Sequence, residues 1–339
     1  MDEKIKINVT THTADILLKD TESFEFYKND GRTLNKNAFI TQLIVNYHDS
    51  FLEKENAQFD YLKKTINASA HINKSDLNRL CYEIVGRFNK EIAAPNKEKF
   101  DKTISVKPTK ESQPIIDYVE EYMLAGCSLS EYFRNMFSFY VSLPQDEREK
   151  IIFKPQYDAV IRAVKQRKKI FFTIKNSPLK RHEAAPFAIA CSKEEMHCYL
   201  LAGVDNSCMT FRLSRIASVV VLNEDAVFTD KQKELFQKML AYGPQFSYGR
   251  DEGEIKVQLT ARGVEKFKKL YVHRPVPVKI DNNDYYFCCS YNQIMQYFVR
   301  FGKDADVVYP QKVRDNLLYF HKDALRRYER KKFNRSGLK

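Results

Sequence analysis

The chain has 339 residues, of which 43% are hydrophobic, and carries a formal net charge of +12. This length predicts two or three domains with substantial hydrophobic cores. No apolar run approaches the roughly 18 residues that a membrane-spanning helix needs, and the charged start lacks the apolar segment of a signal peptide. The seven cysteines show no metal-binding spacing, and their odd count and apolar settings indicate reduced thiols in a cytoplasmic protein.

The positive charge is concentrated in the second half of the sequence. Residues 1–150 hold 21 Lys and Arg against 24 Asp and Glu, a net charge of −3, whereas residues 151–339 hold 35 against 20, a net charge of +15. A basic half of this kind is typical of proteins that bind nucleic acid or another acidic partner. A solvated face with a frayed basic end at residues 331–339 is the alternative.

The N-terminal half contains an internal repeat. Residues 35–50 align without gaps on residues 128–143, and the matched apolar positions recur at spacings of 1, 3, 1 and 3. Such spacing places them on one face of a helix. The matched pairs are Phe39 with Tyr132, Ile40 with Phe133, Leu43 with Met136, Ile44 with Phe137, and Tyr47 with Tyr140.

Each copy follows a short strand and a helix. The strands are expected at residues 4–10 and 103–108, where Ile or Val alternates with polar residues. Strand-helix-helix, twice, resembles the ribbon-helix-helix fold, which two chains normally form by pairing their strands. One chain with both halves could close residues 1–145 into a single tandem unit, with two further helices at about residues 55–92 as an insertion. Chance similarity of two amphipathic helices is the alternative.

The ribbon is one candidate nucleic-acid surface. In ribbon-helix-helix proteins that bind DNA, outward strand side chains enter the major groove. Because this half of the chain is net acidic, phosphate attraction is expected to be weak, and we favour a dimerisation or protein-contact role. The outward residues that the resemblance implies are Lys4, Lys6, Asn8, Thr103, Ser105 and Lys107.

Residues 195–216 are the most informative stretch of the next segment. Two strands are expected around a turn, and period-2 alternation points Phe211 toward a core and Arg212 away from it. Arginines beside a strand, with Tyr199 nearby, can bind a phosphate backbone and stack on bases. Ordinary surface arginines would show the same pattern, and Arg215 could instead hold a turn through a carboxylate.

This segment resembles the WYL domain, named for a Trp-Tyr-Leu run. Residues 198–203 read CYLLAG, with Cys198 in the tryptophan position, and residues 211–222 read FRLSRIASVVVL. The resemblance covers residues 150–228 and implies a small Sm-like or SH3-like β-barrel that senses or binds nucleic acids or nucleotide-like ligands. It carries over the following binding candidates: Tyr199, Arg212 and Arg215, with Arg181 or His182 near the basic position that precedes Pro186. Lys168 and Lys169, which border the first strand, could extend a phosphate track or simply solubilise a helix end.

The remaining chain predicts a helix and linker at residues 229–253 and another module at residues 254–330. Its expected order, strand-helix-strand-strand-helix-strand-helix, is ferredoxin-like. The module also resembles the C-terminal extension that follows many WYL domains. The whole is therefore expected to be an α+β multidomain protein.

Catalytic motifs are missing from the sequence. It has no GxSxG, HExxH or P-loop pattern, and its seven histidines are dispersed, so we expect no enzyme activity, cofactor or metal. A ribbon-helix-helix front end before a WYL domain resembles the WYL accessory proteins of type VI-D CRISPR systems. That resemblance implies a cytoplasmic homodimer that binds single-stranded RNA and enhances an RNA-guided, RNA-cleaving effector. The alternative is a DNA-binding transcriptional regulator whose ribbon reads an operator and whose WYL domain senses a ligand.

Overall fold

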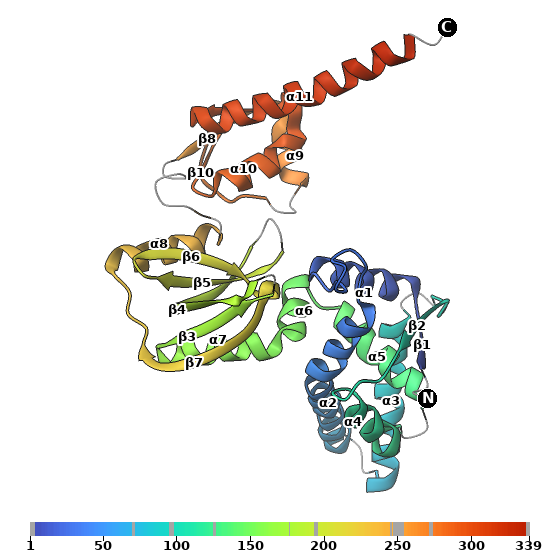
Figure 1. Ribbon diagram of the computed structural model, residues 1–339. Coiled ribbons are helices and arrows are strands. Elements are labelled where there is room, and N and C mark those ends of the chain that lie inside the picture. The colour runs from blue at the N-terminus through green and yellow to red at the C-terminus, as the bar shows by residue number, and fades with distance from the viewer. Residues whose placement is uncertain are drawn as a thin grey trace. The chain divides into compact units, whose positions relative to one another are not determined.

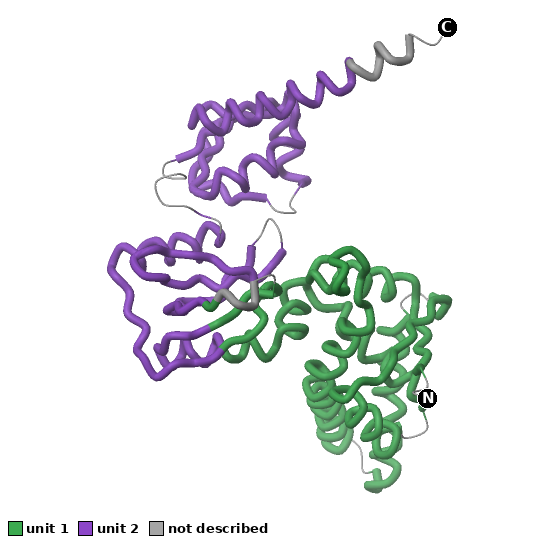
Figure 2. The backbone as a smooth tube through the Cα atoms, viewed as in Figure 1, with its two compact units in different colours: residues 1–159, 172–181, 213–219 green, residues 160–171, 182–212, 220–339 purple. Residues whose placement is uncertain are grey.

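The structure is a computed structural model that divides into two compact units of mixed helices and strands (Figures 1 and 2). Unit 1 comprises residues 1–159, 172–181 and 213–219, and unit 2 comprises residues 160–171, 182–212 and 220–339. The expected linker at 243–253 lies mostly outside the described residues. Those are 4–69, 72–94, 98–124, 127–175, 177–192, 196–244, 246, 254–270 and 274–336.

A two-stranded antiparallel ribbon joins distant parts of unit 1. β1 (Ile5–Val9) pairs with β2 (Lys102–Val106), with Ile7 opposite Ile104. Ile7, Val9 and Val106 are at most 1% exposed, because alternation puts the β-branched residues of both strands on one buried face. The strand pairing within a single chain, which the repeat suggested, is therefore present.

One long helix replaces two that the sequence predicted. The first repeated segment and the start of the expected insertion form a single helix, α2 (Lys36–Ser69), since neither Gly nor Pro interrupts residues 36–69. The other helices of unit 1 are α1 (Thr11–Ser23), α3 (Lys74–Ala93), α4 (Gln113–Tyr118) with a π-helical turn (Val119–Met123), α5 (Leu129–Val141) and α6 (Gln145–Ile152).

The internal repeat supplies the core of unit 1. All ten matched positions on α2 and α5 are at most 5% exposed. The two copies also meet, because the Tyr140 ring lies 6.1 Å from the Tyr47 ring and 6.4 Å from the Phe39 ring between centroids. Aromatic pairs at these separations add to the free energy gained by burying their surfaces.

A buried ion pair crosses this core. Asp20 on α1 has no exposed surface and accepts hydrogen bonds from Arg148 Nε at 2.6 Å and Nη2 at 2.9 Å. Tyr140 Oη on α5 donates to the same carboxylate at 2.9 Å. Burial, and then the Asp20 charge, raise the pKa of Tyr140 well above its usual value, so its hydroxyl keeps the proton that it donates. The three residues connect α1, α5 and α6.

A half-buried carboxylate, Glu55, lies between α2 and α3. Asn89 Nδ2 donates to Glu55 Oε1 at 2.7 Å. Burial raises the pKa of Glu55, and the bond from Asn89 only partly opposes this rise. The ionised form of Glu55 is therefore disfavoured in the native chain.

A five-stranded sheet follows, flanked by α7 (Lys154–Gln166) and α8 (Asp230–Tyr242), and its order is β6-β5-β4-β3-β7. The strands expected for a closed barrel form an open sheet in the described chain. The 3-10 turn Leu213–Arg215 redirects the chain from β6 to the far side of β3, so β6 and β7 remain separate edges. The strands are β3 (Lys168–Ile174), β4 (Ser177–Cys191), β5 (Cys198–Val204), β6 (Ser207–Arg212) and β7 (Ile216–Asp225).

The C-terminal module has the expected element order and an antiparallel sheet, β11-β8-β10-β9. β10 lies between β8 and β9, as in a split β-α-β unit. The last helix continues to residue 336, beyond the expected end near residue 328. The elements are β8 (Ile255–Leu259), α9 (Ala261–Lys269), β9 (Pro277–Asp281), β10 (Asp284–Phe287), α10 (Tyr291–Phe298), β11 (Ala305–Tyr309) and α11 (Gln311–Ser336).

None of the helices in the described ranges combines the length and apolar content that crossing a membrane requires.

Close packing determines which residue can stand at position 263. The first turn of α9 lies directly on the backbone of Asp304, and a Cβ at Gly263 would overlap the Asp304 carbonyl oxygen. Glycine is the residue that allows this approach.

Asp20→Ala is expected to lower the free energy of unfolding by about 3–5 kcal/mol, because Arg148 would remain as a buried charge without its carboxylate. Urea unfolding followed by circular dichroism measures the loss. Asp15→Ala, on the exposed side of the same helix, is the matched control and should change stability by less than about 0.5 kcal/mol. Equal losses in the two variants would contradict the role assigned to the pair.

Glu55→Gln is expected to raise the unfolding temperature at neutral pH and to lose this gain at acidic pH. The native chain holds the Glu55 proton more tightly than the unfolded chain, so native stability falls as pH rises from the usual pKa of 4.5 through the raised value. Glutamine resembles the protonated acid at every pH. Thermal unfolding between about pH 4 and pH 8 tests this, with exposed Glu53→Gln as control, and a pH-independent gain would be the opposing result.

Candidate nucleic-acid interface

Strand pairing brings two of the predicted binding residues together. Tyr199 on β5 lies directly opposite Arg212 on β6, and Ala190 on β4 is next in the same row. Opposite residues of antiparallel strands share a face and contact each other. Because β6 is an edge of the sheet, the half-buried pair Tyr199 and Arg212 lies at the border of the sheet.

His197 positions the guanidinium of Arg212. It is 7% exposed, and its Nε2 lies 2.7 Å from Arg212 Nη2. An imidazole nitrogen accepts a hydrogen bond only when it carries no proton. This contact orients the guanidinium of Arg212. The sequence did not single out His197, although its place two residues before Tyr199 was an available signal.

Arg215 meets a carboxylate instead. It ends the 3-10 turn after β6, and its Nε and Nη2 donate to the carboxylate of Glu25 at 2.8–3.2 Å. This two-pronged geometry is the strong form of an Arg–carboxylate pair. The arrangement matches the alternative in which Arg215 holds a turn, and Glu25, 190 residues away in sequence, was not foreseen.

Arg181 and His182 lie on β4, where Arg181 is exposed and His182 is half-buried. The His182 ring lies 5.6 Å from the Phe211 ring between centroids. Phe211 immediately precedes Arg212 in β6, so the two side chains point to opposite faces. His182 therefore does not join the Tyr199–Arg212 pair.

The two lysines at the start of β3 are paired with acidic residues. Lys168 Nζ donates to Asp225 Oδ1 at 2.7 Å. Lys169 Nζ donates to Glu183 at 2.7 Å and to Glu224 at 2.8 Å. These hydrogen bonds raise the pKa of Lys169, and the bond to Glu183 has the larger effect. Neighbouring carboxylates thus offset the charge of the phosphate track that the sequence predicted.

The ribbon presents its polar residues on one exposed face. Lys6 lies opposite Ser105 and Asn8 lies opposite Thr103, and Thr103 Oγ1 donates to Asn8 Oδ1 at 2.9 Å. The alternation therefore placed this set correctly on the side away from Ile7. Two further candidates are exposed just outside the paired strands: Lys4 and Lys107.

Metal binding has no support among the residues that the structure describes. No group of His, Cys, Asp or Glu there is arranged to hold an ion. The seven cysteines are free thiols. The candidate interface is therefore built from aromatic, cationic and neutral polar groups, which suit binding to a polyanion.

Arg212→Ala is expected to reduce the slope of log affinity against log salt for single-stranded RNA by about 0.7, because one phosphate contact is lost. Lys168→Ala and Lys169→Ala should leave the slope unchanged, since both ammonium groups already bind carboxylates. Fluorescence anisotropy at several salt concentrations measures all three. A larger change in slope for the lysine variants than for Arg212→Ala would contradict this assignment.

Comparison with known proteins identifies a shared fold. No protein-family model matches the chain, and no curated protein matches it. A solved structure described as "Crystal structure of a CRISPR Cas-related protein" is similar over 98% of this chain and 95% of that chain, with a TM-score of 0.68 and 16% identity. The proteasome accessory factor B/C of Arthrobacter aurescens also matches, over 68% of this chain and 38% of that one, at 12% identity and a TM-score of 0.25 that carries no argument. The first likeness shows that nearly the whole chain has the fold of that CRISPR Cas-related protein.

Proposed function

We propose that this chain is a non-catalytic accessory protein of a CRISPR system that binds single-stranded RNA. The observation that carries the proposal is the fold likeness to a CRISPR Cas-related protein, which extends over both chains almost completely. Likeness over a single domain would be weaker support, because common folds serve many functions. Here the likeness covers 98% of this chain and 95% of that chain.

The RNA-binding part of the proposal rests on the border of the five-stranded sheet. An aromatic ring and an oriented guanidinium lie opposite each other, Arg212 on the edge strand β6 and Tyr199 on its neighbour β5. Single-stranded nucleic acids are bound by aromatic platforms combined with basic surfaces. Residues 151–339, which contain this pair, carry a net charge of +15, and long-range attraction would guide a polyanion toward them.

The proposal extends to the family and the partner. We assign the five-stranded sheet to a WYL domain and the paired β1 and β2 with their helices to a tandem ribbon-helix-helix unit. The partner is the RNA-guided, RNA-cleaving effector of a type VI-D system. A homodimer is supported by large hydrophobic side chains on α11 that are at least 50% exposed, namely Leu318, Tyr319, Phe320, Leu325 and Tyr328.

A DNA-binding regulator is the second candidate, because the exposed face of the ribbon matches the type of surface that β-ribbon proteins place in the major groove. The acidic half around it argues for the RNA proposal. Residues 1–150 carry a net charge of −3, and phosphate neutralisation supplies most of the affinity for duplex DNA.

Competition between unlabelled single-stranded RNA and duplex DNA for labelled RNA tests the two candidates. RNA should compete better, and Tyr199→Ala should weaken RNA binding by roughly 5- to 150-fold, the loss of one base-stacking contact. Lys6→Ala is the matched comparison on the ribbon and should have little effect. Better competition by duplex DNA, with Lys6→Ala the more damaging change, would favour the regulator.

The same variants then test the CRISPR role. Wild-type protein added to the purified guide-loaded effector should increase its rate of RNA cleavage, and Tyr199→Ala should reduce that increase in proportion to its loss of RNA affinity. An effector rate that does not respond to the wild-type protein would refute the accessory role and leave RNA binding as a separate result.

A further inference from the structure

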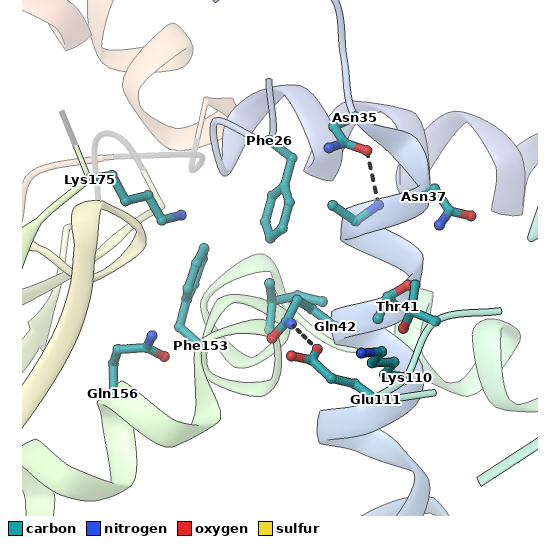
Figure 3. A pocket seen from close by; sticks show the side chains of 13 residues that line it. Phe26, Asn35, Asn37, Thr41, Gln42, Lys110, Glu111, Phe153, Gln156 and Lys175 are labelled. Carbon is teal, nitrogen blue, oxygen red and sulfur yellow. Dashed lines mark hydrogen bonds between the residues drawn. The ribbon is translucent and has the colours of Figure 1, made fainter. Parts of the chain in front are cut away.

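Unit 1 contains a pocket that the proposed function has not used. Its volume is about 640 Å³, which lies within the range of about 300–1,000 Å³ that small-molecule sites occupy. It is formed by the stretch that runs from the loop after α1 into the start of α2, the loop after β2, the junction of α6 and α7, and the turn after β3 (Figure 3). All of these segments belong to unit 1.

Two aromatic rings form an apolar wall of this pocket. Phe26 and Phe153 are stacked at 6.0 Å between centroids with an interplanar angle of 28°. Phe153 is 3% exposed and Phe26 is half-buried. The ammonium group of Lys175 lies 4.4 Å from the Phe153 centroid and 5.0 Å from the Phe26 centroid. The wall therefore combines flat apolar surface with a fixed cation, a pairing that favours a planar group next to a negative one.

The opposite wall is polar and includes a buried hydroxyl. Thr41 is 4% exposed, and its Oγ1 has no hydrogen-bond partner among the described residues. A buried hydroxyl without a partner costs free energy, which a ligand atom in the pocket would recover. Two amide groups lie nearby. Gln42 accepts from Asn46 Nδ2 at 3.2 Å and donates to Glu111 Oε2 at 3.4 Å, and Gln156 Nε2 donates to the Ala217 carbonyl oxygen at 3.0 Å, so a ligand would exchange these bonds for its own. Such groups match the hydrogen-bonding edge of a nucleobase.

The start of α2 adds a positive end to the pocket. Asn35 caps the helix by accepting from Ala38 N at 3.1 Å, and the first turn contains no acidic residue. No carboxylate of that turn opposes the positive end of the helix dipole, and the carboxylate that does line the pocket, Glu111, comes from the loop after β2. In Figure 3, Lys110 and Lys175 stand on opposite sides of the pocket. A nucleotide inside a strand has a phosphate on each side, which this arrangement of cations suits.

We propose that this pocket binds one nucleotide, with its base against Phe26 and Phe153, its edge toward Thr41 and its phosphates toward Lys175 and Lys110. The inference rests on the proposed function where the nucleotide belongs to an RNA strand. A free mononucleotide offers the same chemistry. An RNA strand would then contact the protein in two places, with one base in this pocket and another at the Tyr199–Arg212 pair.

The test uses the full chain and two variants. Thr41→Val removes the hydroxyl at nearly constant volume, and Lys175→Gln removes the cation. Calorimetric titration with AMP, UMP and inorganic phosphate, and anisotropy with labelled single-stranded RNA, measure binding. Each variant should lower nucleotide or RNA affinity by roughly 3- to 10-fold. Lys19→Gln, an exposed lysine of α1 that does not line the pocket, should bind as wild type. Thr41→Val should also unfold at an equal or higher temperature without ligand, which separates lost binding from lost folding.

The outcomes distinguish the sources. If both variants lose RNA affinity and no mononucleotide binds, the ligand is a nucleotide of an RNA strand. If mononucleotides bind, and both variants lose that affinity but keep their affinity for RNA, the ligand is a free nucleotide. If neither variant changes any affinity, or inorganic phosphate binds as well as AMP, the inference is overturned. Wild-type RNA binding that depends on Arg212 alone would keep the proposed function while the pocket fails. Mononucleotide binding without RNA binding would support the pocket and contradict the proposed RNA-binding function.

Discussion

The buried pair of Asp20 and Arg148 determines the position of α6, and much of unit 1 follows from it. A carboxylate without exposed surface needs its partner at short range, and Arg148 Nε is 2.6 Å away. The next residue, Glu149, is also fully buried and accepts from Ser214 N at 3.2 Å. Ser214 lies in the 3-10 turn whose last residue, Arg215, pairs with Glu25. This series of contacts explains why Arg215 holds a turn while Arg212, three residues earlier, lies at the border of the sheet.

Local patterns predicted the parts of the fold in which local forces dominate. The apolar repeat identified ten core positions because helical spacing alone decides which face of a helix is buried. Alternation likewise identified Ile7 and Val9 as the inner residues of β1. The same reasoning placed a break after residue 50 that the structure does not have, since an end of apolar spacing does not end a helix that lacks Gly and Pro. The open sheet was also missed, because resemblance to a barrel gives strand order and not the path of the turn Leu213–Arg215.

The sequence did not predict which residues the charged side chains contact. Arg212, Arg215 and Lys169 are all cationic side chains of one segment. The structure places Arg212 beside an imidazole, Arg215 beside one carboxylate and Lys169 beside two. Their partners lie 15, 190, and 14 and 55 residues away, so no motif links them. The net charge of a half therefore overstates the charge available for phosphate, and the identity of each partner decides which cations can bind it. The pocket of unit 1 that contains Thr41 could not be predicted from the sequence for the same reason, since its walls come from four separate segments.

These contacts also weigh the ribbon against the sheet border as a binding surface. Asn8, one of the two polar residues of β1, already accepts from Thr103 Oγ1 at 2.9 Å through its side chain and from Arg134 Nε at 2.6 Å through its carbonyl oxygen. Reading a base would require replacing the first of these bonds, so the net gain in free energy would be small. Tyr199 carries an aromatic ring, and stacking on a ring does not depend on which hydrogen-bonding groups a base presents. A surface of that kind suits single strands of varied sequence, whereas operator recognition depends on the polar side chains that the ribbon uses internally.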